Sequence, residues 1–456
     1  MGSRAMMDLV EAARVVSGRL EGANARFSGV STDSRAVGAG ELFVALQGER
    51  FDGHAYVGEA ARRGAVGALT ARHVKEAGAG LPQIVVADTR LGLGALAGDW
   101  RRRFAIPLVA LTGSNGKTTV KEMLAAILGE HAGSRGAVLA TAGNLNNDIG
   151  MPLTLLALRP DHRYAVIEMG MNHEGEIDYL ARIARPTVAL VNNAQRAHVG
   201  ILGSLEAIAR AKGEIYAGLD EGGIAIVNDD DAFAPYWKGL NAGRKVLTFG
   251  FGADSDVSAA SAAGEWRFRT PAGSFAVALR APGEHNARNA LAACAAAHAV
   301  GIPPAAMRSA LAAFEGVPGR LQRRPAPGGA RVIDDTYNAN PESMKAAIRV
   351  LAAEPGRRVL VMGDMGELGI QSAAMHAEVG DFAKRSGVEV LLALGEQSRN
   401  AAQAFGAGAR HFGEARELLA AARKEARADT TLLVKGSRFM QMERVADALA
   451  GGSDAL

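Results

Sequence analysis

Short apolar runs of strand length alternate with helical patterns along much of the chain, and this alternation restricts the possible folds more than any other feature. In the middle of the chain the runs cover residues 109–112, 164–169, 188–192 and 223–228. In the last third they cover residues 331–333, 358–362, 388–394 and 431–434, separated by helical patterns such as 341–353 and 373–386. Strands that alternate with helices form βαβ units and a parallel sheet. The sequence therefore predicts an α/β fold, with ligands at the carboxyl ends of the strands.

Two changes in composition divide the chain of 456 residues into three stretches. The first is a basic cluster at 101–103, ahead of the strand-like run at 106–111; such a triplet is usually a solvated helix end, and we use it only as a boundary marker. The second is the segment 316–330, which is rich in proline, glycine and arginine. Domains commonly contain about 100–200 residues. We therefore expect three domains, at residues 1–105, 106–318 and 319–456.

Charge and composition exclude several classes of protein. Lys and Arg number 51 against 48 Asp and Glu, whereas a dedicated nucleic-acid binder carries a large basic excess. The single cysteine, Cys294, rules out an intrachain disulfide and lies in an alanine-rich helical pattern typical of a buried, inert thiol. The N-terminal segment lacks the apolar core of a signal peptide, and no run approaches the roughly 18 apolar residues of a membrane span. We therefore expect a cytoplasmic protein without membrane insertion, and, since no pattern demands assembly, a monomer.

Residues 112–119, with the sequence TGSNGKTT, form the strongest local motif. They lie between the run at 106–111 and a helical pattern that continues to about residue 128. In a glycine-containing loop that enters a helix, backbone N–H groups and the helix dipole face phosphate oxygens. Lys117 would reach the β- and γ-phosphates, and the Thr118 hydroxyl would bind magnesium. The first glycine position of the general phosphate-loop pattern is Leu111, so the match is incomplete, but the strand–loop–helix context favours an ATP or GTP site over a structural turn.

Two further polar residues follow predicted strands. Glu168 lies at the end of an apolar run, where a carboxylate could hold Mg²⁺ at the same sheet edge as the phosphate loop. Such a glutamate, taken alone, is more often a salt-bridge partner. His198 comes after Asn192 and Asn193 at the end of the next strand, and a lone histidine is more often a surface or capping residue. Both alternatives stay open on these residues alone.

Asparagine side chains gather in two other segments. Asn144, Asn146 and Asn147 lie in a glycine-containing stretch that is either an ordinary loop or a source of donors for an anionic or amide-rich ligand. Farther along, Asn286 is a plausible N-cap of an alanine-rich helix. Asn289 would then lie one turn into that helix, where its amide could read an edge such as that of adenine.

Four segments occur in a characteristic order: TGSNGKTT at 112–119, EMG at 168–170, GEHNARNA at 283–290 and DTYNANP at 335–341. Together they resemble the motifs of the Mur ligase family, the ATP-dependent amide ligases that build the peptide stem of bacterial cell-wall precursors. The leucine at 111 is normal for that family. Within it, the segments NLNNDIGMP (144–152), YNANP (337–341) and GDMGELG (363–369) look like the member that joins D-alanyl-D-alanine to a UDP-N-acetylmuramoyl tripeptide. The resemblance covers essentially the whole chain.

The resemblance implies three α/β domains: a small N-terminal domain that binds the uridine nucleotide, a central parallel-sheet ATPase domain, and a Rossmann-like C-terminal domain. The segments STDSR (31–35), ELFVALQG (41–48) and DGH (52–54) are similar to the first of these. The implied reaction forms an amide bond through an acyl phosphate and releases ADP and phosphate. The implied cofactors are ATP, two Mg²⁺ ions, and carbon dioxide held as a carbamate on Lys212.

The resemblance also implies roles for individual residues. The residues implied to bind ATP are Gly113, Ser114, Asn115, Gly116, Lys117, Thr118, Thr119, Asn289, Arg320 and Asp335. Those implied to hold magnesium are Thr118, Glu168, His198 and Lys212, and those implied to be catalytic are Lys117, His198, Lys212 and Arg320. The implied substrate-binding residues are Ser34, Arg35, His54, Asn144, Asn146, Asn147, Asn338, Asn340, Lys435 and Arg438.

Three alternatives stay open. Another ligase of the Mur type is one, although residues 338–341 disfavour the member that adds diaminopimelate or lysine. A folylpolyglutamate-type ligase is the second, which the TDSR segment at 32–35 disfavours. A phosphate-loop regulatory ATPase is the third, and it leaves Glu168, His198 and Lys212 without a role. The sequence leaves open whether the third residue of the peptide substrate is diaminopimelate or lysine.

Overall fold

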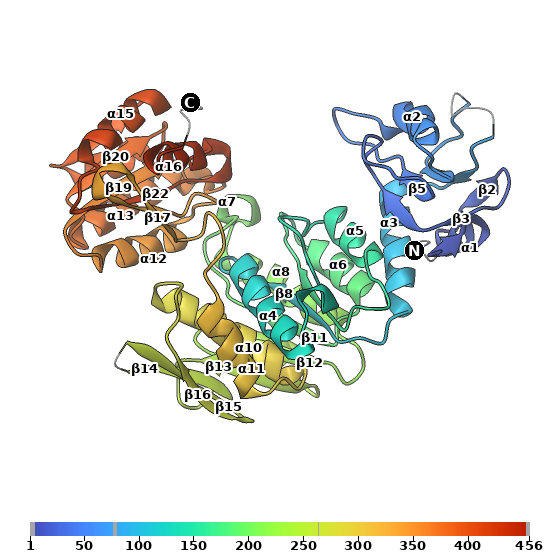
Figure 1. The fold of residues 1–456 in the computed structure, drawn as a ribbon, viewed down its shortest axis with the longest axis horizontal. Coiled ribbons are helices and arrows are strands. Elements are labelled where there is room, and N and C mark those ends of the chain that lie inside the picture. Colours follow the sequence, from blue (N-terminus) through green and yellow to red (C-terminus); the bar gives the residue numbers. More distant parts are fainter. Residues whose placement is uncertain (1–4, 76–79, 263, 453–456) are drawn as a thin grey trace.

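Three main sheets follow one another along the chain, each with its own helices (Figure 1). The structure is a computed structural model that describes residues 5–75, 80–262 and 264–452. Residues 1–4, part of the segment predicted to contain no signal peptide, lie outside the described ranges. The mixed α/β architecture in three parts confirms the predicted fold class. The domain limits after residues 105 and 318 stay a prediction.

The first sheet has five strands in the order β2–β7–β6–β5–β4. Its strands are β2 (Arg19–Glu21), β4 (Gly29–Ser31), β5 (Glu41–Val44), β6 (Gly67–Thr70) and β7 (Gln83–Val85). Only β2 is antiparallel to its neighbour. This part also contains the strand pair β1 (Met7–Asp8) and β3 (Arg26–Phe27), and the helices α1 (Leu9–Val15), α2 (Val57–Arg62) and α3 (Thr89–Arg102).

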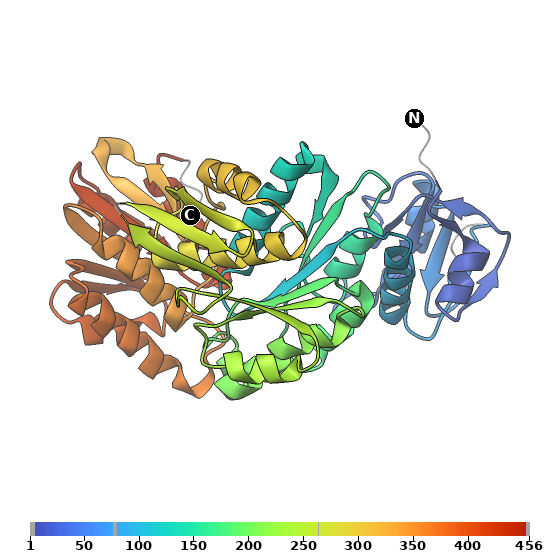
Figure 2. The same cartoon turned by 90° about the horizontal axis from the view of Figure 1, so that it is seen from below.

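The central sheet has nine strands in the order β16–β15–β14–β13–β12–β11–β8–β10–β9. The parallel strands are β8 (Leu108–Thr112), β9 (Val138–Ala140), β10 (Tyr164–Glu168), β11 (Val188–Val191), β12 (Ile224–Asn228), β13 (Lys245–Gly250) and β14 (Val257–Ala262). The fully buried strands β8, β10 and β11 are those that read as apolar runs in the sequence, because helices cover both faces of the sheet (Figure 2).

The central sheet differs from the prediction at one edge. There β15 (Glu265–Thr270) and β16 (Gly273–Val277) extend the parallel strands with an antiparallel meander. Only two residues separate β14 from β15, and so short a connection forces an antiparallel pair, since a parallel pair needs a crossover. These strands alternate buried and exposed residues, so they lack the continuous apolar runs of the strands that the sequence revealed.

Side chains of alternate residues in the central strands point to opposite helical layers. Val109 and Leu111 pack with helices α4 (Lys117–Ala132), α10 (Glu284–Ala299) and α11 (Pro304–Ala313). Leu108 and Ala110 belong to the core on the other face, to which α5 (Gly150–Leu156), α6 (Glu176–Ala184), α8 (Leu205–Gly213) and α9 (Ala234–Leu240) contribute. A short helix, α7 (Val199–Leu202), precedes α8.

The third sheet has six strands in the order β17–β18–β22–β19–β20–β21. They are β17 (Gln322–Pro325), β18 (Arg331–Asp334), β19 (Arg357–Gly363), β20 (Val390–Leu394), β21 (Ala409–Phe412) and β22 (Thr430–Lys435), and only β17 is antiparallel. The helices are α12 (Pro341–Ala352), α13 (Ser372–Arg385), α14 (Ser398–Phe405), α15 (Ala415–Glu425) and α16 (Glu443–Leu449). Within the described part of the chain, no helix combines the length and apolar character needed to cross a membrane.

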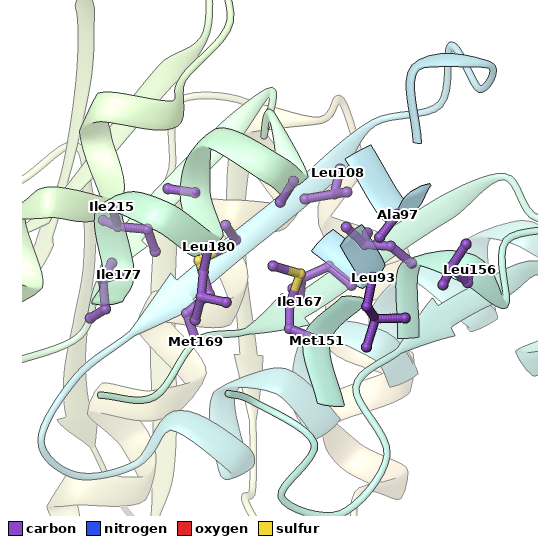
Figure 3. Close-up of a cluster of buried hydrophobic side chains, with 14 of the residues drawn as sticks. Leu93, Ala97, Leu108, Met151, Leu156, Ile167, Met169, Ile177, Leu180 and Ile215 are labelled. Carbon is purple, nitrogen blue, oxygen red and sulfur yellow. The ribbon is translucent and has the colours of Figure 1, made fainter. Parts of the chain in front are cut away.

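One apolar core crosses from the first part of the chain into the central part. Leu93 and Ala97 of α3 belong to the same buried cluster as Met151 of α5 and Ile167 of β10 (Figure 3). At Gly94 a Cβ atom would lie 2.2 Å from the hydroxyl oxygen of Tyr179 in α6, so the glycine permits this close packing. The helix α3 therefore fixes the N-terminal sheet to the central sheet.

The basic cluster at the end of α3 is not simply a solvated helix end, as the sequence suggested. Arg101 is 5% exposed, and its Nε donates to the carbonyl oxygen of Ala184, the last residue of α6, at 3.1 Å. Its two terminal nitrogens donate to the carbonyl oxygens of Phe104 and Ile106. The guanidinium thus gives hydrogen-bond donors to a carbonyl group at the end of α6 and to two carbonyl groups in the segment that follows α3. Arg102 and Arg103 pair with Asp99, as a helix surface allows.

Candidate active site

A cavity of about 1400 Å³ lies at the carboxyl ends of the central strands and is lined from all three parts of the chain. Arg90 and Leu91 of α3 line it, and Arg90 forms an ion pair of 3.0 Å with Asp148. The predicted residues on its wall are Ser114, Asn115, Gly116, Lys117, Thr118, Thr119, Asn144, Asn146, Asn147, Glu168, His198, Lys212, Asn289, Arg320, Asp335, Asn338, Asn340, Lys435 and Arg438. The fold therefore brings together nearly all of the residues that the sequence singled out.

The phosphate loop is held by the segment that follows β11. The backbone N–H of Ser114 donates to the Asn193 carbonyl oxygen at 3.0 Å, and that of Asn115 donates to the Asn193 side chain at 2.9 Å. The Ser114 hydroxyl donates to the Gln195 carbonyl oxygen, and the Asn115 amide donates to the Gln195 side chain. The Asn192 amide donates to the Asn115 carbonyl oxygen at 2.9 Å. These bonds fix the loop between the strand end and helix α4.

Gly116 ends the loop in a conformation that only glycine adopts easily. Its φ is +80°, and a Cβ atom there would lie 2.2 Å from Oδ1 of Asn289. The next residue begins α4, whose first-turn N–H groups have no partner within the helix. The loop therefore presents backbone donors and the positive end of the helix dipole to the cavity, as an anion site requires.

Lys117 lies at the first position of α4 with its ammonium folded back over the loop. Nζ donates to the Gly113 carbonyl oxygen at 2.7 Å. Burial lowers the pKa of Lys117 below its usual value, although the carboxylate of Glu168 acts against this. An ammonium group in such a place gains from a bound anion, because a phosphate would restore the stabilisation that burial removes.

The Thr118 hydroxyl is a meeting point of the central and C-terminal parts of the chain. It donates to Oε2 of Glu168 at 3.0 Å and accepts from Nη2 of Arg320 at the same distance. Glu168 is 2% exposed, and its other oxygen accepts from the Asn146 amide at 2.8 Å. Arg320 also stacks on the ring of Tyr337, 4.2 Å from its centroid. A hydroxyl and a carboxylate side by side at a phosphate loop form a donor set suited to Mg²⁺.

His198 and Lys212 line the same cavity from α7 and α8. The His198 ring nitrogen Nδ1 lies 2.6 Å from Oε2 of Glu367 in the C-terminal part. Lys212 is 1% exposed, and burial lowers the pKa of its amine well below the usual value, with a further contribution from the charge of Lys117. Among the described residues no three His, Cys, Asp or Glu side chains gather closely enough to hold a metal by themselves. A site here would combine Glu168 and His198 with Thr118 and a modified Lys212.

Beside Gly116 of the phosphate loop, Asn289 lies inside α10 and is 6% exposed. Its Oδ1 accepts from the Asn192 amide at 3.2 Å, so the side chain is held against the phosphate loop. Asn286 is not the N-cap: α10 begins at Glu284, and Asn286 donates from inside the helix to the Pro282 carbonyl oxygen at 2.7 Å. The Gly283 φ of +93° lets the chain turn into the helix three residues earlier than the sequence suggested.

Asp335 and Lys435 form an ion pair of 2.7 Å on the C-terminal wall of the cavity. The Lys435 ammonium also donates to the carbonyl oxygen of Asn338 at 2.7 Å, and Lys435 is only 2% exposed. Its donors are therefore largely used within its own part of the chain. The structure points to Lys435 as a residue that holds the segment 335–338 in place, rather than one that reaches out to a ligand.

The remaining asparagines of the cavity differ in how much of their side chain is free. Asn340 caps α12 through the backbone N–H of Ser343, and its amide donates to Oδ1 of Asn115 at 2.8 Å. Oδ1 of Asn147 accepts from the backbone N–H of Gly150, the first residue of α5, at 2.8 Å, so it is used in the turn that leads into the helix. Asn338 accepts from the next backbone N–H. Asn144 is exposed at the cavity wall, as are Asn147 and Asn338, but no hydrogen bond engages its side chain among the described residues.

Three predicted substrate residues lie in the first part of the chain and do not line the cavity, as far as the described residues define its wall. His54 is 2% exposed, with Nδ1 2.5 Å from Asp52 and Nε2 accepting from the backbone N–H of Ala71. Ser34 donates to Glu59 at 3.2 Å. Arg35 pairs with Asp33 at the surface. His54 therefore has a structural role, and any direct contact with a ligand falls to the more exposed Arg35.

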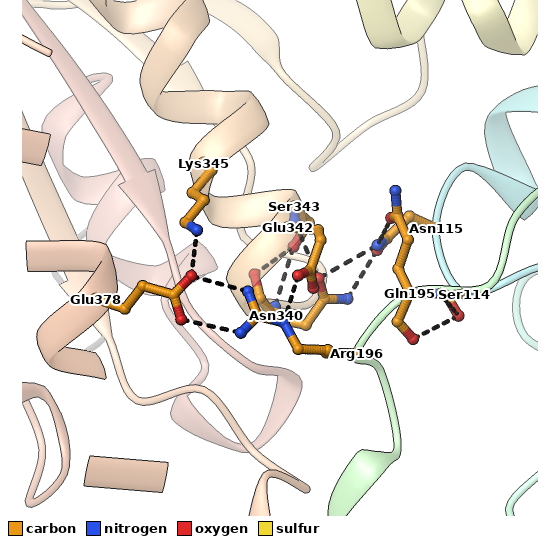
Figure 4. Close-up of polar contacts among 9 residues, drawn as sticks. All are labelled: Ser114, Asn115, Gln195, Arg196, Asn340, Glu342, Ser343, Lys345 and Glu378. Carbon is orange, nitrogen blue, oxygen red and sulfur yellow. Dashed lines mark hydrogen bonds and ion pairs between the residues drawn. The ribbon is translucent and has the colours of Figure 1, made fainter. Parts of the chain in front are cut away.

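The segment after β11 also ties the central part to the C-terminal part (Figure 4). Arg196 donates to Glu342 at 2.5 Å and to both oxygens of Glu378 at 2.9 and 3.0 Å. Lys345 pairs with the same glutamate. The hydrogen bonds from Arg196 lower the pKa of Glu378 to about 2. Together with the Asn115–Asn340 contact, this cluster fixes the C-terminal part over the phosphate loop.

Replacing Arg196 with methionine is expected to release the C-terminal part for more of the time. Hydrogen bonds to charged groups contribute about 1.5–3 kcal/mol in sheltered sites, but this one is partly exposed, so we expect a loss of about 1–2 kcal/mol in total. The equilibrium between the docked and the released C-terminal part would shift about tenfold toward the released state. Small-angle X-ray scattering should show a larger radius of gyration. Arg185→Met is the control, because Arg185 pairs with Asp220 inside the central part. Scattering unchanged by Arg196→Met would show that other contacts hold the interface.

Sequence reasoning missed several residues that shape this site. Asn192 and Asn193 stood out only as polar residues after a strand, and Gln195, Arg196 and Glu367 received no role. The first four follow β11 directly, at the same sheet edge as the phosphate loop, and this position is a signal that could have identified them. Glu367 lies in the GDMGELG segment that the sequence singled out, but nothing local indicates its contact with His198, which comes from a distant segment.

Comparison with known proteins agrees with this geometry. Family models match three regions: the Mur ligase family catalytic domain at residues 26–101, the Mur ligase middle domain at 111–297, and the Mur ligase glutamate ligase domain at 319–438. The chain is 46% identical to the UDP-N-acetylmuramoyl-tripeptide–D-alanyl-D-alanine ligase of Escherichia coli strain K12, over 95% of this chain and 96% of the relative.

Solved structures give the same picture. A crystal structure of MurF from Acinetobacter baumannii matches with a TM-score of 0.89 and 37% identity, covering 97% of this chain and 98% of the other. MurF ligase from Thermotoga maritima in complex with ADP matches with a TM-score of 0.80 and 27% identity, covering 93% and 97%. The sequence motifs, the three-sheet architecture and the full-length similarity all lead to one conclusion: this chain belongs to the Mur ligase family.

Proposed function

We propose that this chain is an ATP-dependent ligase that joins D-alanyl-D-alanine to a UDP-N-acetylmuramoyl tripeptide in the synthesis of the peptidoglycan precursor. The observation that carries the proposal is the Thr118 hydroxyl, which contacts both Glu168 of the central part and Arg320 of the C-terminal part beside the phosphate loop. Phosphoryl groups would be bound where the two parts meet. The similarity to ligases of this activity along nearly the full chain supports the choice of substrates.

A carboxylate forms an amide only after activation, because its own leaving group would be oxide. In the proposed reaction the terminal carboxylate oxygen of the peptide attacks the γ-phosphorus of ATP, the bond to the bridging oxygen breaks, and ADP leaves. The amine of D-alanyl-D-alanine then attacks the acyl phosphate. A C–N bond forms, phosphate leaves, and the amine nitrogen gives up its proton. ADP and phosphate are the products besides the amide.

The residues of this chain would serve the first step through charge. The Lys117 ammonium lies over the phosphate loop and the Arg320 guanidinium donates to the Thr118 hydroxyl, so both could face the transferred phosphoryl group. Thr118, Glu168 and His198 would hold Mg²⁺, which supplies charge neutralisation to the phosphate oxygens when bound. The loop from 192 to 198 fixes the phosphate loop and so keeps these groups in register. Closure of the C-terminal part would keep water away from the acyl phosphate.

Lys212 is proposed to carry the carbamate. Carbon dioxide adds only to a neutral amine, and burial favours the neutral form of this one. The product is an anion with oxygen ligands, suited to a second Mg²⁺ near His198. At the nucleotide end, Asn289 and Asp335 are proposed to contact the adenine and the ribose. Asn144, Asn338 and Arg438 are proposed to contact the peptide substrates.

A phosphate-release assay tests the proposal. Release should require both the uridine-linked tripeptide and D-alanyl-D-alanine, and omitting either should lower the rate by about a hundredfold, because the acyl phosphate would be shielded from water. Comparing the diaminopimelate and lysine forms of the tripeptide identifies the third residue. Release without the dipeptide would favour a regulatory ATPase. Turnover with glutamate and a folate would favour the folylpolyglutamate-type ligase instead.

We also propose that the enzyme is a cytoplasmic monomer that acts on small molecules and not on nucleic acid. The near balance of 51 basic and 48 acidic residues supports the last point, since a few placed cations suffice for an anionic substrate. Size-exclusion chromatography with light scattering would test the monomer: a mass near 47.3 kDa is expected, and twice that value would contradict it.

A further inference from the structure

His198 of the central part and Glu367 of the C-terminal part meet at the edge of the cavity. Nδ1 of His198 lies 2.6 Å from Oε2 of Glu367, and the His198 side chain is 20% exposed. Nδ1 has no hydrogen-bond partner among the described residues, so its contact with the Glu367 carboxylate is a close electrostatic one. Nδ1 is buried, and the carboxylate of Glu367 is the polar group beside it. His198 lies in the central part of the chain and Glu367 in the C-terminal part, so only the tertiary fold creates the pair.

Both residues of this pair have an unfavourable backbone conformation. His198 has a φ of +64° and Glu367 a φ of +63°, both in the left-handed region that non-glycine residues avoid. Such a conformation is unfavourable for a residue with a Cβ atom and persists only where the surroundings hold it. Strain of this kind gathers at functional sites. Two strained residues that face each other across an interface therefore point to a function of the pair.

Backbone contact fixes the distance between the two elements. The N–H of Gly200, in α7, donates to the carbonyl oxygen of Glu367 at 2.9 Å. A Cβ atom at Gly200 would lie 2.4 Å from the backbone nitrogen of Gly369. The two backbone segments thus approach as closely as glycine permits. This contact keeps Glu367 close to His198.

The loop that carries Glu367 is itself rigid. Its neighbours on the N-terminal side are bonded to three different elements of the C-terminal part: Asp364 accepts from the backbone N–H of Ser398 at 2.7 Å, the N–H of Met365 donates to His376 at 2.9 Å, and the N–H of Gly366 donates to Ser437 at 2.8 Å. The position of Glu367 therefore follows the position of the whole C-terminal part.

A carboxylate beside one nitrogen of a histidine determines where the ring proton lies. The negative charge near Nδ1 favours the tautomer with the proton on Nδ1, which leaves the lone pair on Nε2. Histidine ligands of metals commonly have such an outer partner, which fixes the tautomer and the orientation of the ring. Within the described residues, no hydrogen bond engages Nε2 of His198.

We propose that Glu367 is a positioning residue for His198: from the C-terminal part, it holds the imidazole in the tautomer and orientation that bind a divalent cation at the phosphate loop. The inference rests on the proposed ATP–magnesium site. It means that the metal site is complete only when the C-terminal part is docked, because the partner of His198 arrives with that part. Glu367 needs no contact with substrate or metal for this role.

The test is Mn²⁺ binding to the full-length chain in the presence of a non-hydrolysable ATP analogue, measured by electron paramagnetic resonance. Glu367→Ala should weaken the affinity for Mn²⁺ by about tenfold or more, the range found for outer partners of metal ligands. Glu367→Gln keeps an acceptor oxygen for Nδ1–H, so it should bind Mn²⁺ with intermediate affinity. Glu378→Gln is the matched control, because it removes another glutamate charge from the same interface without touching His198. It should change the affinity by less than about threefold.

Three results would overturn the inference: Mn²⁺ affinity unchanged in Glu367→Ala, affinity increased in that variant, which would make Glu367 a competitor of the metal, or an equal loss in Glu378→Gln, which would make the effect one of docking alone. None of these measurements uses the peptide substrates. If the unsubstituted chain fails to bind Mn²⁺ with the analogue, the proposed ATP–magnesium site itself is wrong. Normal binding by the unsubstituted chain with no effect of Glu367→Ala refutes only the role of Glu367.

Discussion

Replacing Lys117 with methionine is expected to lower kcat/KM for ligation by about a thousandfold, since removal of one well-placed donor to a developing charge costs about 10²–10³ in rate. Methionine has a similar length and no charge, so it removes the ammonium and little of the packing. The rate of phosphate release should be measured as the ATP concentration is varied, with both peptide substrates at saturation, and ADP affinity should be measured by calorimetry. Stability should not fall, because burial already disfavours the ammonium in the absence of a ligand.

Lys117→Arg is the matched variant for this prediction. It keeps the positive charge, but its planar fork is longer and does not fit the bond to the Gly113 carbonyl oxygen. We expect it to bind ADP better than Lys117→Met while remaining well below the unsubstituted activity. A Lys117→Met enzyme with more than about a tenth of the original kcat/KM would show that Lys117 does not face the transferred phosphoryl group.

Lys212→Ala is expected to lose about as much activity, and to recover part of it when a short carboxylic acid such as formate or acetate is added. The alanine leaves a space at a position that is 1% exposed in the cavity wall, and a small carboxylate there could replace the oxygens of the carbamate. The loss should again be near a thousandfold, because a charged oxygen donor at the metal site would be missing. Activity should be followed across a series of acid concentrations and should saturate.

Lys212→Met provides the control, because methionine fills the space that alanine leaves open. It should be as inactive as Lys212→Ala and should show no recovery with added acids. Carbon-13 NMR of the unsubstituted protein in labelled bicarbonate should give a carbamate signal that Lys212→Met lacks. The signal should weaken as pH falls through the pKa of the Lys212 amine, which burial lowers, because the protonated amine does not react with carbon dioxide. Full activity in either variant would contradict the carbamate.

Several local expectations were confirmed because the information needed for them lies in short segments. The buried strands β8, β10 and β11 read as apolar runs, since both of their faces are covered. The meander β15–β16 escaped notice, because one face is exposed and its residues alternate. Arg101 was misinterpreted for a related reason: its partner, the end of α6, is far away in the sequence and leaves no mark beside the arginine.

The roles of polar residues were harder to read than their location. The sequence placed Asn147, Asn340 and Lys435 at the candidate site, and the structure puts all three on the cavity wall. Yet Asn147 bonds to the backbone of the turn before α5, Asn340 caps α12 while it bonds to the phosphate loop, and Lys435 holds Asp335. A side chain of one type can bond to a ligand or to the backbone, and the sequence does not show which partner is nearer.

The sequence by itself determined the α/β class, the position of the phosphate loop and the family, because each depends on residue types at fixed spacing along the chain. Only the tertiary structure decided how the three parts share one site. Thr118 with Arg320, Asn115 with Asn340, and His198 with Glu367 all join residues that are more than a hundred positions apart. Such contacts depend on how sheets and helices pack against one another. A local sequence pattern does not determine the distance between two atoms that this packing brings together.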